Sequence, residues 1–215
     1  MRFEHGINNK YLRSIEAAFD AILDKGNDLH RAIAGLILES DMLVRVRPVS
    51  EISASGVTGL IDRGDTNDRI EDERLRLIEA LGEVYIAIAE ETIDTGGQRG
   101  CEGTFVHEGR HAYDFSRVIE SFSMADVNPL SVFDPTLYEL ELEAHKLSGD
   151  YMLCVGRDEY VEEGLGLMIL GRKDPIAPCY VDDLGIHTRL ANSYGLDPIK
   201  NPGPRASELL GLRSK

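Results

Sequence analysis

Two histidines and a glutamate within five residues could form the centre of a metal site. His107 and His111 belong to the segment His107-Glu108-Gly109-Arg110-His111. On a helix, residues i and i+4 lie on one face, about 6 Å apart along the axis. The two imidazoles can therefore bind the same tetrahedral cation, and zinc commonly takes such ligands.

Glu108 lies between the two histidines in the sequence and could act as a general base. It is rotated by about 100° from His107 around the helix axis, so it is poorly placed to act as a further ligand. It can instead reach a water bound to the metal, which is the position of a general base. Histidine pairs at this spacing are common on protein surfaces, whereas the pair with the intervening glutamate indicates metal-assisted hydrolysis.

A zinc site that does hydrolysis needs one more protein ligand and an open position for water. Residues 137–145 offer three glutamates, Glu139, Glu141 and Glu143. A helical projection turns Glu139 away from the apolar stripe, toward solvent. Glu141 and Glu143 lie on opposite borders of the stripe, and the projection alone does not choose between them. We favour Glu141, because His145 follows it one turn later on the same border.

The predicted ligands are therefore His107, His111 and Glu141, with Glu143 as the alternative third ligand. His145 could support a ligand or stabilise the transition state, and it fits equally well as a half-buried structural histidine. The group that stabilises the oxyanion is not identified by the pattern. The candidates are Tyr113, Tyr151, Tyr160, Arg110, His145 and His187.

The residues before the histidine segment predict a small β-sheet. Strands are expected over residues 42–49, 55–61 and 83–90, from alternating or continuous apolar positions. The last of these is apolar on both faces, so we expect it at the centre of the sheet and covered on both sides. The sheet should thus have about three strands, with the histidine helix following its central strand.

Helical periodicity and capping signals account for most of the remaining chain. The histidine helix should begin near Thr104, after a glycine-rich break at 96–100, and end near Ser121. The ligand helix should begin at Asp134-Pro135, with the aspartate as cap. The other expected elements are helices over 9–24, 28–39, 74–81 and 158–170, a charged loop over 64–73, a loop over 123–129, a turn over 174–178, and a linker over 201–204 before a short terminal helix.

Together these elements predict an α+β fold, in which helices pack on the small sheet. The chain has 215 residues, which suits one domain over 1–215. We expect its core over about 40–155, with helical extensions at the N- and C-terminal ends.

The composition limits the classes of partner. A formal charge of -15 repels phosphate backbones and anionic lipid, so we expect neither nucleic acid nor a membrane as partner. The charge could suit a basic protein substrate, or it could serve solubility alone. The three cysteines form no CxxC pair, and no apolar stretch reaches membrane-spanning length. These features favour a cytoplasmic protein, and export as an effector without a cleaved signal is also compatible with them.

The motif pair resembles the glutamate-zincin zinc metallopeptidases. His107-Glu108-x-x-His111 is followed by Glu141-x-x-Ala144-His145, where that group usually has Glu-x-x-x-Asp. Over about residues 40–155, the pattern is most similar to the short intracellular metallopeptidases that cleave repressors, and to related effector and toxin peptidase domains. The ligand helix of those enzymes often reads Glu-x-Glu-Ala-Asn. His145 departs from both patterns.

The resemblance implies a zincin-like active-site helix, Zn²⁺ held by two histidines and Glu141, and cleavage of a protein or peptide with Glu108 as general base. Three other interpretations remain compatible with the sequence. They are a non-catalytic metal-binding interaction module on the same scaffold, a metal-free helical protein in which the motif arose by chance, and a zinc enzyme that hydrolyses a non-peptide amide or ester.

Overall fold

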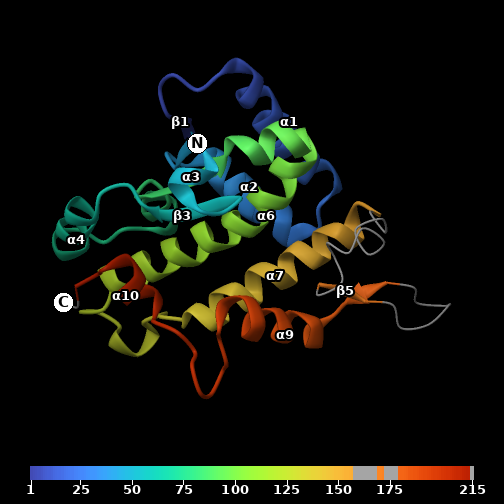
Figure 1. Ribbon diagram of the computed structural model, residues 1–215. Helices are drawn as coiled ribbons and strands as arrows, with labels where there is room; N and C mark the ends of the chain where they lie inside the picture. The colour runs from blue at the N-terminus through green and yellow to red at the C-terminus, as the bar shows by residue number, and fades with distance from the viewer. Residues whose placement is uncertain (157–168, 172–178, 214–215) are drawn as a thin grey trace.

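The computed structural model describes residues 1–156, 169–171 and 179–213, and within them it confirms the α+β fold. Helices surround a four-stranded mixed sheet, and a two-stranded sheet lies near the end of α7 (Figure 1). The strands are β1 (Arg2–Phe3), β2 (Leu43–Arg47), β3 (Gly56–Leu60), β4 (Val84–Ala89), β5 (Leu170–Gly171) and β6 (Tyr180–Val181). The helices are α1 (Asn9–Lys25), α2 (Asp28–Glu39), α3 (Val49–Ile52), α4 (Arg63–Asp72), α5 (Leu77–Leu81), α6 (Glu90–Ser123), η1 (Pro129–Ser131), α7 (Leu137–Cys154), α9 (Asp183–Tyr194) and α10 (Ala206–Leu210).

The main sheet has the order β1-β2-β4-β3, which places β4 inside the sheet as predicted. β2 runs parallel to β4, and β3 pairs antiparallel to β4 and forms one edge of the sheet. The expected cover on both sides of β4 is confirmed for most of the strand, because Ala87 and Ala89 on the second face are also buried. Tyr85 points to the second face and lies under the guanidinium of Arg45, 4.3 Å from the ring centroid, so this face is partly polar.

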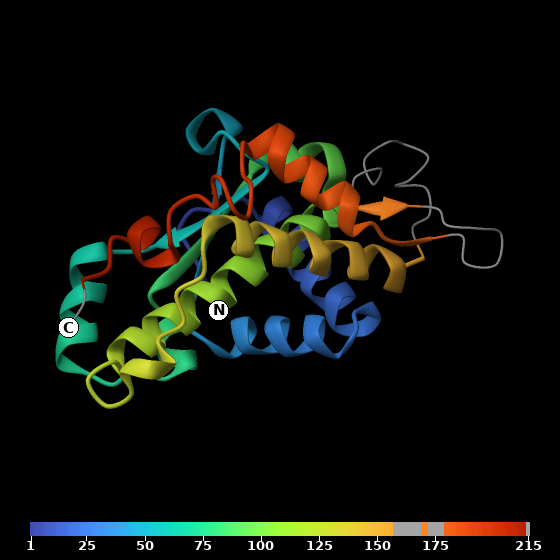
Figure 2. The ribbon, with the colours of Figure 1, turned by 90° about the horizontal axis from the view of Figure 1, so that it is seen from below.

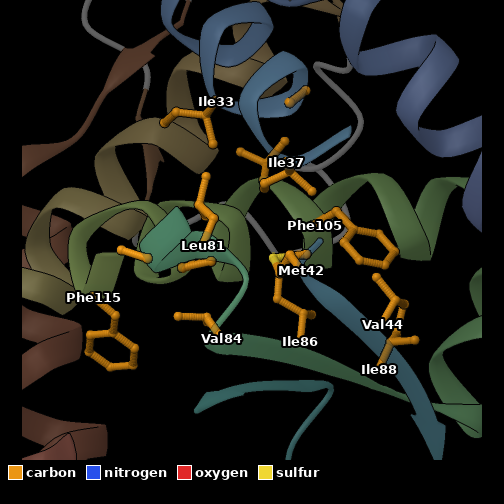
Figure 3. Close-up of a cluster of buried hydrophobic side chains, with 14 of the residues drawn as sticks. Ile33, Ile37, Met42, Val44, Leu81, Val84, Ile86, Ile88, Phe105 and Phe115 are labelled. Carbon is orange, nitrogen blue, oxygen red and sulfur yellow. The ribbon is translucent and has the colours of Figure 1, made fainter. Parts of the chain in front are cut away.

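The core lies between the other face of the sheet and the helices. Val84, Ile86 and Ile88 alternate along β4 and are fully buried. Figure 3 shows Ile33 and Ile37 of α2 among the side chains that pack in this region. Burial of branched apolar side chains is the main stabilising contribution to such a core, and it fixes α6 against the sheet.

α6 is the longest helix, and it begins earlier than the sequence suggested. It starts at Glu90, immediately after β4, instead of near Thr104. The predicted glycine break is a kink within this helix, because Gly97 adopts φ 54° and ψ -137°. Glycine reaches this conformation without the steric cost that a Cβ atom would add.

The prediction of a charged loop over 64–73 is wrong, because α4 covers most of it. Asp62 caps the helix by accepting hydrogen bonds from the backbone N–H groups of Gly64 and Asp65. The inward face of α4 is largely polar, and apolar periodicity therefore failed to indicate it. Thr66 and Asn67 are buried there, with Thr66 donating to Glu83 and Asn67 donating to the Gly211 carbonyl.

The predicted cap of the ligand helix is also wrong. α7 is capped by Thr136, in a reciprocal arrangement with Glu139. Asp134 accepts hydrogen bonds from the backbone and hydroxyl of Ser207 instead, which connects it to the distant helix α10. A local capping rule cannot anticipate a partner that is 73 residues away.

Some elements near the chain ends were not predicted, and some predicted elements lie outside the described residues. The sequence did not indicate the short strand β1 or the helix α9. Most of the helix expected over 158–170 lies outside the described residues, and its last residue, Leu170, belongs to β5. The turn expected over 174–178 also lies outside them. In the parts of the chain that the structure describes, no helix has both the length and the apolar character needed to cross a membrane.

Candidate metal centre

The site depends on how α7 packs against α6. The two helices lie side by side in both views of the ribbon (Figures 1 and 2), and each contributes to the core. Leu140, Ala144 and Leu147 form the buried stripe of α7. Glu141 follows Leu140 at the border of this stripe, so the packing that buries the leucines also turns Glu141 toward the histidines of α6.

The structure brings His107, His111 and Glu141 together. The two histidine Nε2 atoms lie 3.2 Å apart, and each lies 3.5 Å from a different oxygen of Glu141. One ligand atom can be taken from each residue so that all three lie within 4.8 Å of one another. Two ligand atoms bound at about 2.0–2.1 Å to a tetrahedral zinc ion would be about 3.3 Å apart. The spacing of these donors therefore fits a single small cation.

The electrostatics of the group also favour a cation. Burial alone would raise the pKa of Glu141, but the facing imidazoles of His107 and His111 lower it below the usual range. Burial opposes a proton on His111, yet the facing Glu141 and the nearby Glu108 raise its pKa. The carboxylate thus stays ionised and attracts positive charge. A divalent ion would supply that charge and also satisfy Glu141 Oε2, a buried oxygen without a hydrogen-bond donor.

The other two glutamates of the ligand helix have different partners. Glu139 is exposed and accepts hydrogen bonds from the backbone and hydroxyl of Thr136 at the start of α7. Glu143 lies 3.6 Å from Arg110 and is not part of the group that could hold a metal. Of the three, Glu141 is the one placed to bind a metal.

Glu108 lies beside this group and is held by the edge strand of the sheet. The hydroxyl of Thr58 on β3 donates a 2.7 Å hydrogen bond to Glu108 Oε2. The strand approaches α6 closely because residue 56 is glycine: a Cβ atom there would lie 2.5 Å from Thr104 Cγ2 and 2.8 Å from Glu108 Cγ. The absence of a side chain at Gly56 therefore lets Thr58 reach Glu108.

His145 lies next to the metal group but outside it. It is buried, its Nε2 atom lies 3.8 Å from Glu141 Oε2, and its ring centroid is 4.8 Å from that of His107. Burial and the neighbouring His107 lower the pKa of His145 to about 3, so the ring is neutral at neutral pH. A neutral imidazole beside Glu141 can support the ligand or contact a substrate.

A large cleft opens at the metal group. It has a volume of about 1160 Å³ and is lined by residues of β3, α6, α7 and α9. Its walls are mostly apolar, and they include Val57, Leu60, Phe115 and Leu140. A cleft of this size can accept several residues of an extended peptide or a small organic molecule.

Of the six candidates for oxyanion stabilisation, two line the cleft in the described part of the chain. His145 and Tyr151 line the cleft, although the Tyr151 hydroxyl donates to Glu102. Arg110 is paired with Asp114 at 2.7 Å. The remaining candidates are Tyr113, which is not part of the cleft lining, His187, which is exposed and contacts Tyr138, and Tyr160, which lies outside the described residues.

Thr58, Arg189 and Tyr194 are polar cleft residues that the sequence pattern did not indicate. Thr58 lies on β3 opposite Ile86 of β4, and this strand pairing, not the local sequence, directs its side chain toward α6. Arg189 and Tyr194 belong to α9, which was not predicted. No local motif marks these residues, and only the tertiary fold brings them to the histidines.

Comparison of the chain with protein-family models, with curated proteins and with solved structures found no match. The geometry and chemistry of the site are therefore the basis for assigning a function.

The ligand assignment predicts different effects for two neighbouring glutamates. Glu141→Gln should weaken zinc binding by more than the roughly 10–100-fold typical of changes in groups that only support a ligand. Glu143→Gln makes the same chemical change two residues away and should leave the affinity nearly unchanged. Competition with a chelator of known zinc affinity measures both. Equal affinities for the two variants would show that Glu141 is not a ligand.

Proposed function

We propose that this protein is a zinc-dependent hydrolase, and specifically a metallopeptidase that cleaves peptide bonds in a protein or peptide substrate. The observation that carries the proposal is the group of three ligand atoms at an open cleft, with Glu108 held beside it by Thr58. The resemblance of His107-Glu108-x-x-His111 and Glu141 to the glutamate-zincin pattern supports the same assignment.

The main alternative is a binding module that holds metal without turnover. Structural zinc sites are usually closed by four protein ligands, whereas catalytic sites leave a position open. Among the described residues, the group that meets the distance requirement contains only His107, His111 and Glu141, and the neighbouring His145 is outside it. This arrangement favours an open, catalytic site.

Zinc in this site would lower the pKa of a coordinated water toward about 7 and polarise the carbonyl of the bond to be cut. Glu108 would accept a proton as the water oxygen adds to the carbonyl carbon. It would then give that proton to the amine that leaves when the C–N bond breaks. Thr58 is a positioning residue, because it orients one carboxylate oxygen and leaves the other free to exchange the proton.

The edge strand offers a way to bind an extended chain. Among the described residues, β3 has a neighbouring strand, β4, on one side only, so the N–H and C=O groups of its other side can pair with a partner strand. Residues 54–60 of this strand region line the cleft. A substrate peptide that adds to β3 would run past Glu108 and the metal group.

The first functional prediction separates metal binding from catalysis. Glu108→Gln keeps the shape of the side chain and removes the base, so zinc content should remain at the wild-type level. The rate of peptide cleavage should fall by about 10²–10⁴-fold, which is the range for a positioned general base. Metal analysis and mass spectrometry of a digested peptide mixture measure the two quantities. A zinc-loaded variant that keeps most of the wild-type rate would contradict the assigned role of Glu108.

A second prediction concerns the orientation of Glu108. Thr58→Val removes the hydroxyl at nearly constant volume and should lower kcat by about 5–10-fold, as expected for the loss of one hydrogen bond. Thr58→Ser retains the hydroxyl and should restore most of the rate. If Thr58→Val keeps the wild-type rate, or if Thr58→Ser loses as much activity as Thr58→Val, the hydroxyl of Thr58 does not position the base.

A further inference from the structure

The cleft at the metal centre is lined by arginines, although the chain as a whole is strongly acidic. Arg63 and Arg189 line the cleft, and among the described residues only Glu108 and Glu141 contribute carboxylates to its lining. Both glutamates already have roles in the metal centre. The remainder of the described lining therefore carries no negative charge, in a protein with a formal net charge of -15.

Arg189 is brought to the cleft by the packing of α9 on α7. Ile186 and Leu190 are fully buried in a small apolar cluster with Tyr138 of α7. Asp182 caps the start of α9 by accepting from the backbone N–H of Gly185. These contacts fix the helix, and Arg189 projects from it into the wall of the cleft.

The guanidinium of Arg189 has an unused hydrogen-bond donor. Its Nε atom is buried and has no hydrogen-bond partner. Within the described part of the chain, no carboxylate forms an ion pair with Arg189. A buried donor on a charged group is costly when it is left without an acceptor. Because Arg189 also lines the cleft, a negatively charged ligand bound there would supply a partner for the charge of its guanidinium.

Arg189 also lies at the same end of the cleft as the metal group. Tyr194 follows Arg189 on α9, and the Tyr194 ring packs edge-on to His145 with 5.9 Å between centroids. His145 in turn lies 3.8 Å from Glu141. A ligand held by Arg189 would therefore sit within a few residues of a peptide bond at the metal.

We propose that Arg189 binds a carboxylate of the substrate, and that the enzyme selects acidic peptides. This inference rests on the proposed function and deepens it. Guanidinium and carboxylate groups form paired, charge-assisted hydrogen bonds, which give both affinity and orientation. The carboxylate can come from an Asp or Glu side chain or from a free C-terminus. The overall acidity of the chain suggested a basic substrate, but the lining of the cleft indicates the opposite charge.

The test measures binding without turnover. The probes are fluorescein-labelled octapeptides with one apolar sequence, each carrying a single Glu, Gln or Lys at one position in turn. Every peptide is made with a free and with an amidated C-terminus. Fluorescence anisotropy measures their affinity for the zinc-loaded Glu108→Gln protein, alone and combined with Arg189→Gln. Arg13→Gln, at an exposed arginine of α1, is the control for the same change of charge.

The proposal predicts that Glu peptides, or peptides with a free C-terminus, bind about tenfold or more tightly than their neutral counterparts. A difference between Glu and Gln peptides would identify a side-chain carboxylate as the ligand. A difference between free and amidated peptides would identify the C-terminal carboxylate. Arg189→Gln should abolish the preference, and Arg13→Gln should retain it. A preference for Lys, a preference that persists in Arg189→Gln, or no binding of any acidic peptide would overturn the proposal.

The same peptides distinguish this inference from the proposed function. Wild-type protein that cuts peptides with no dependence on their charge would refute the role of Arg189 and leave the hydrolase assignment intact. Charge-selective binding that depends on Arg189, with no cleavage of any peptide by the zinc-loaded wild type, would refute the hydrolase and leave the carboxylate site.

Discussion

The site depends on the interaction between the buried carboxylate of Glu141 and the imidazoles of His107 and His111. An ionised Glu141 inside the protein would cost several kcal/mol without a positive partner, and neutral histidines compensate only part of that cost. Either a proton shared with His111 or a bound cation can supply the charge. Since a cation that binds the folded state stabilises it, metal binding and the packing of α7 on α6 should support each other.

The sheet contributes to the site through its edge. In the described parts of the chain β3 is an edge strand beside β4. It approaches α6 closely because Gly56 lacks the side chain that would prevent this approach. Thr58 then reaches Glu108 from an element that is far from both ligand helices in sequence. The same edge remains open toward the cleft. One strand thus orients the proposed base and offers backbone groups to an extended substrate.

The sequence predicted those parts of the structure that depend on local spacing. The i, i+4 relation of His107 and His111 follows from helical geometry, and the choice of Glu141 followed from its neighbour His145 and the family spacing. Features set by distant partners could not be predicted. Asp134 accepts a hydrogen bond from Ser207 instead of capping α7. The buried face of α4 is largely polar, so apolar residues do not recur there at helical spacing. Arg189 reaches the metal centre only because α9 packs on α7.

The proposed function depends most directly on the identity of the metal ligands. A crystal structure of the protein loaded with zinc, with anomalous diffraction data collected at the zinc absorption edge, would test this assignment. We expect one zinc ion per chain, bound by Nε2 of His107, Nε2 of His111 and the carboxylate of Glu141, with no fourth protein ligand and with Glu108 beside the open position. An ion closed by His145 as a fourth ligand, or the absence of zinc from this group, would contradict it.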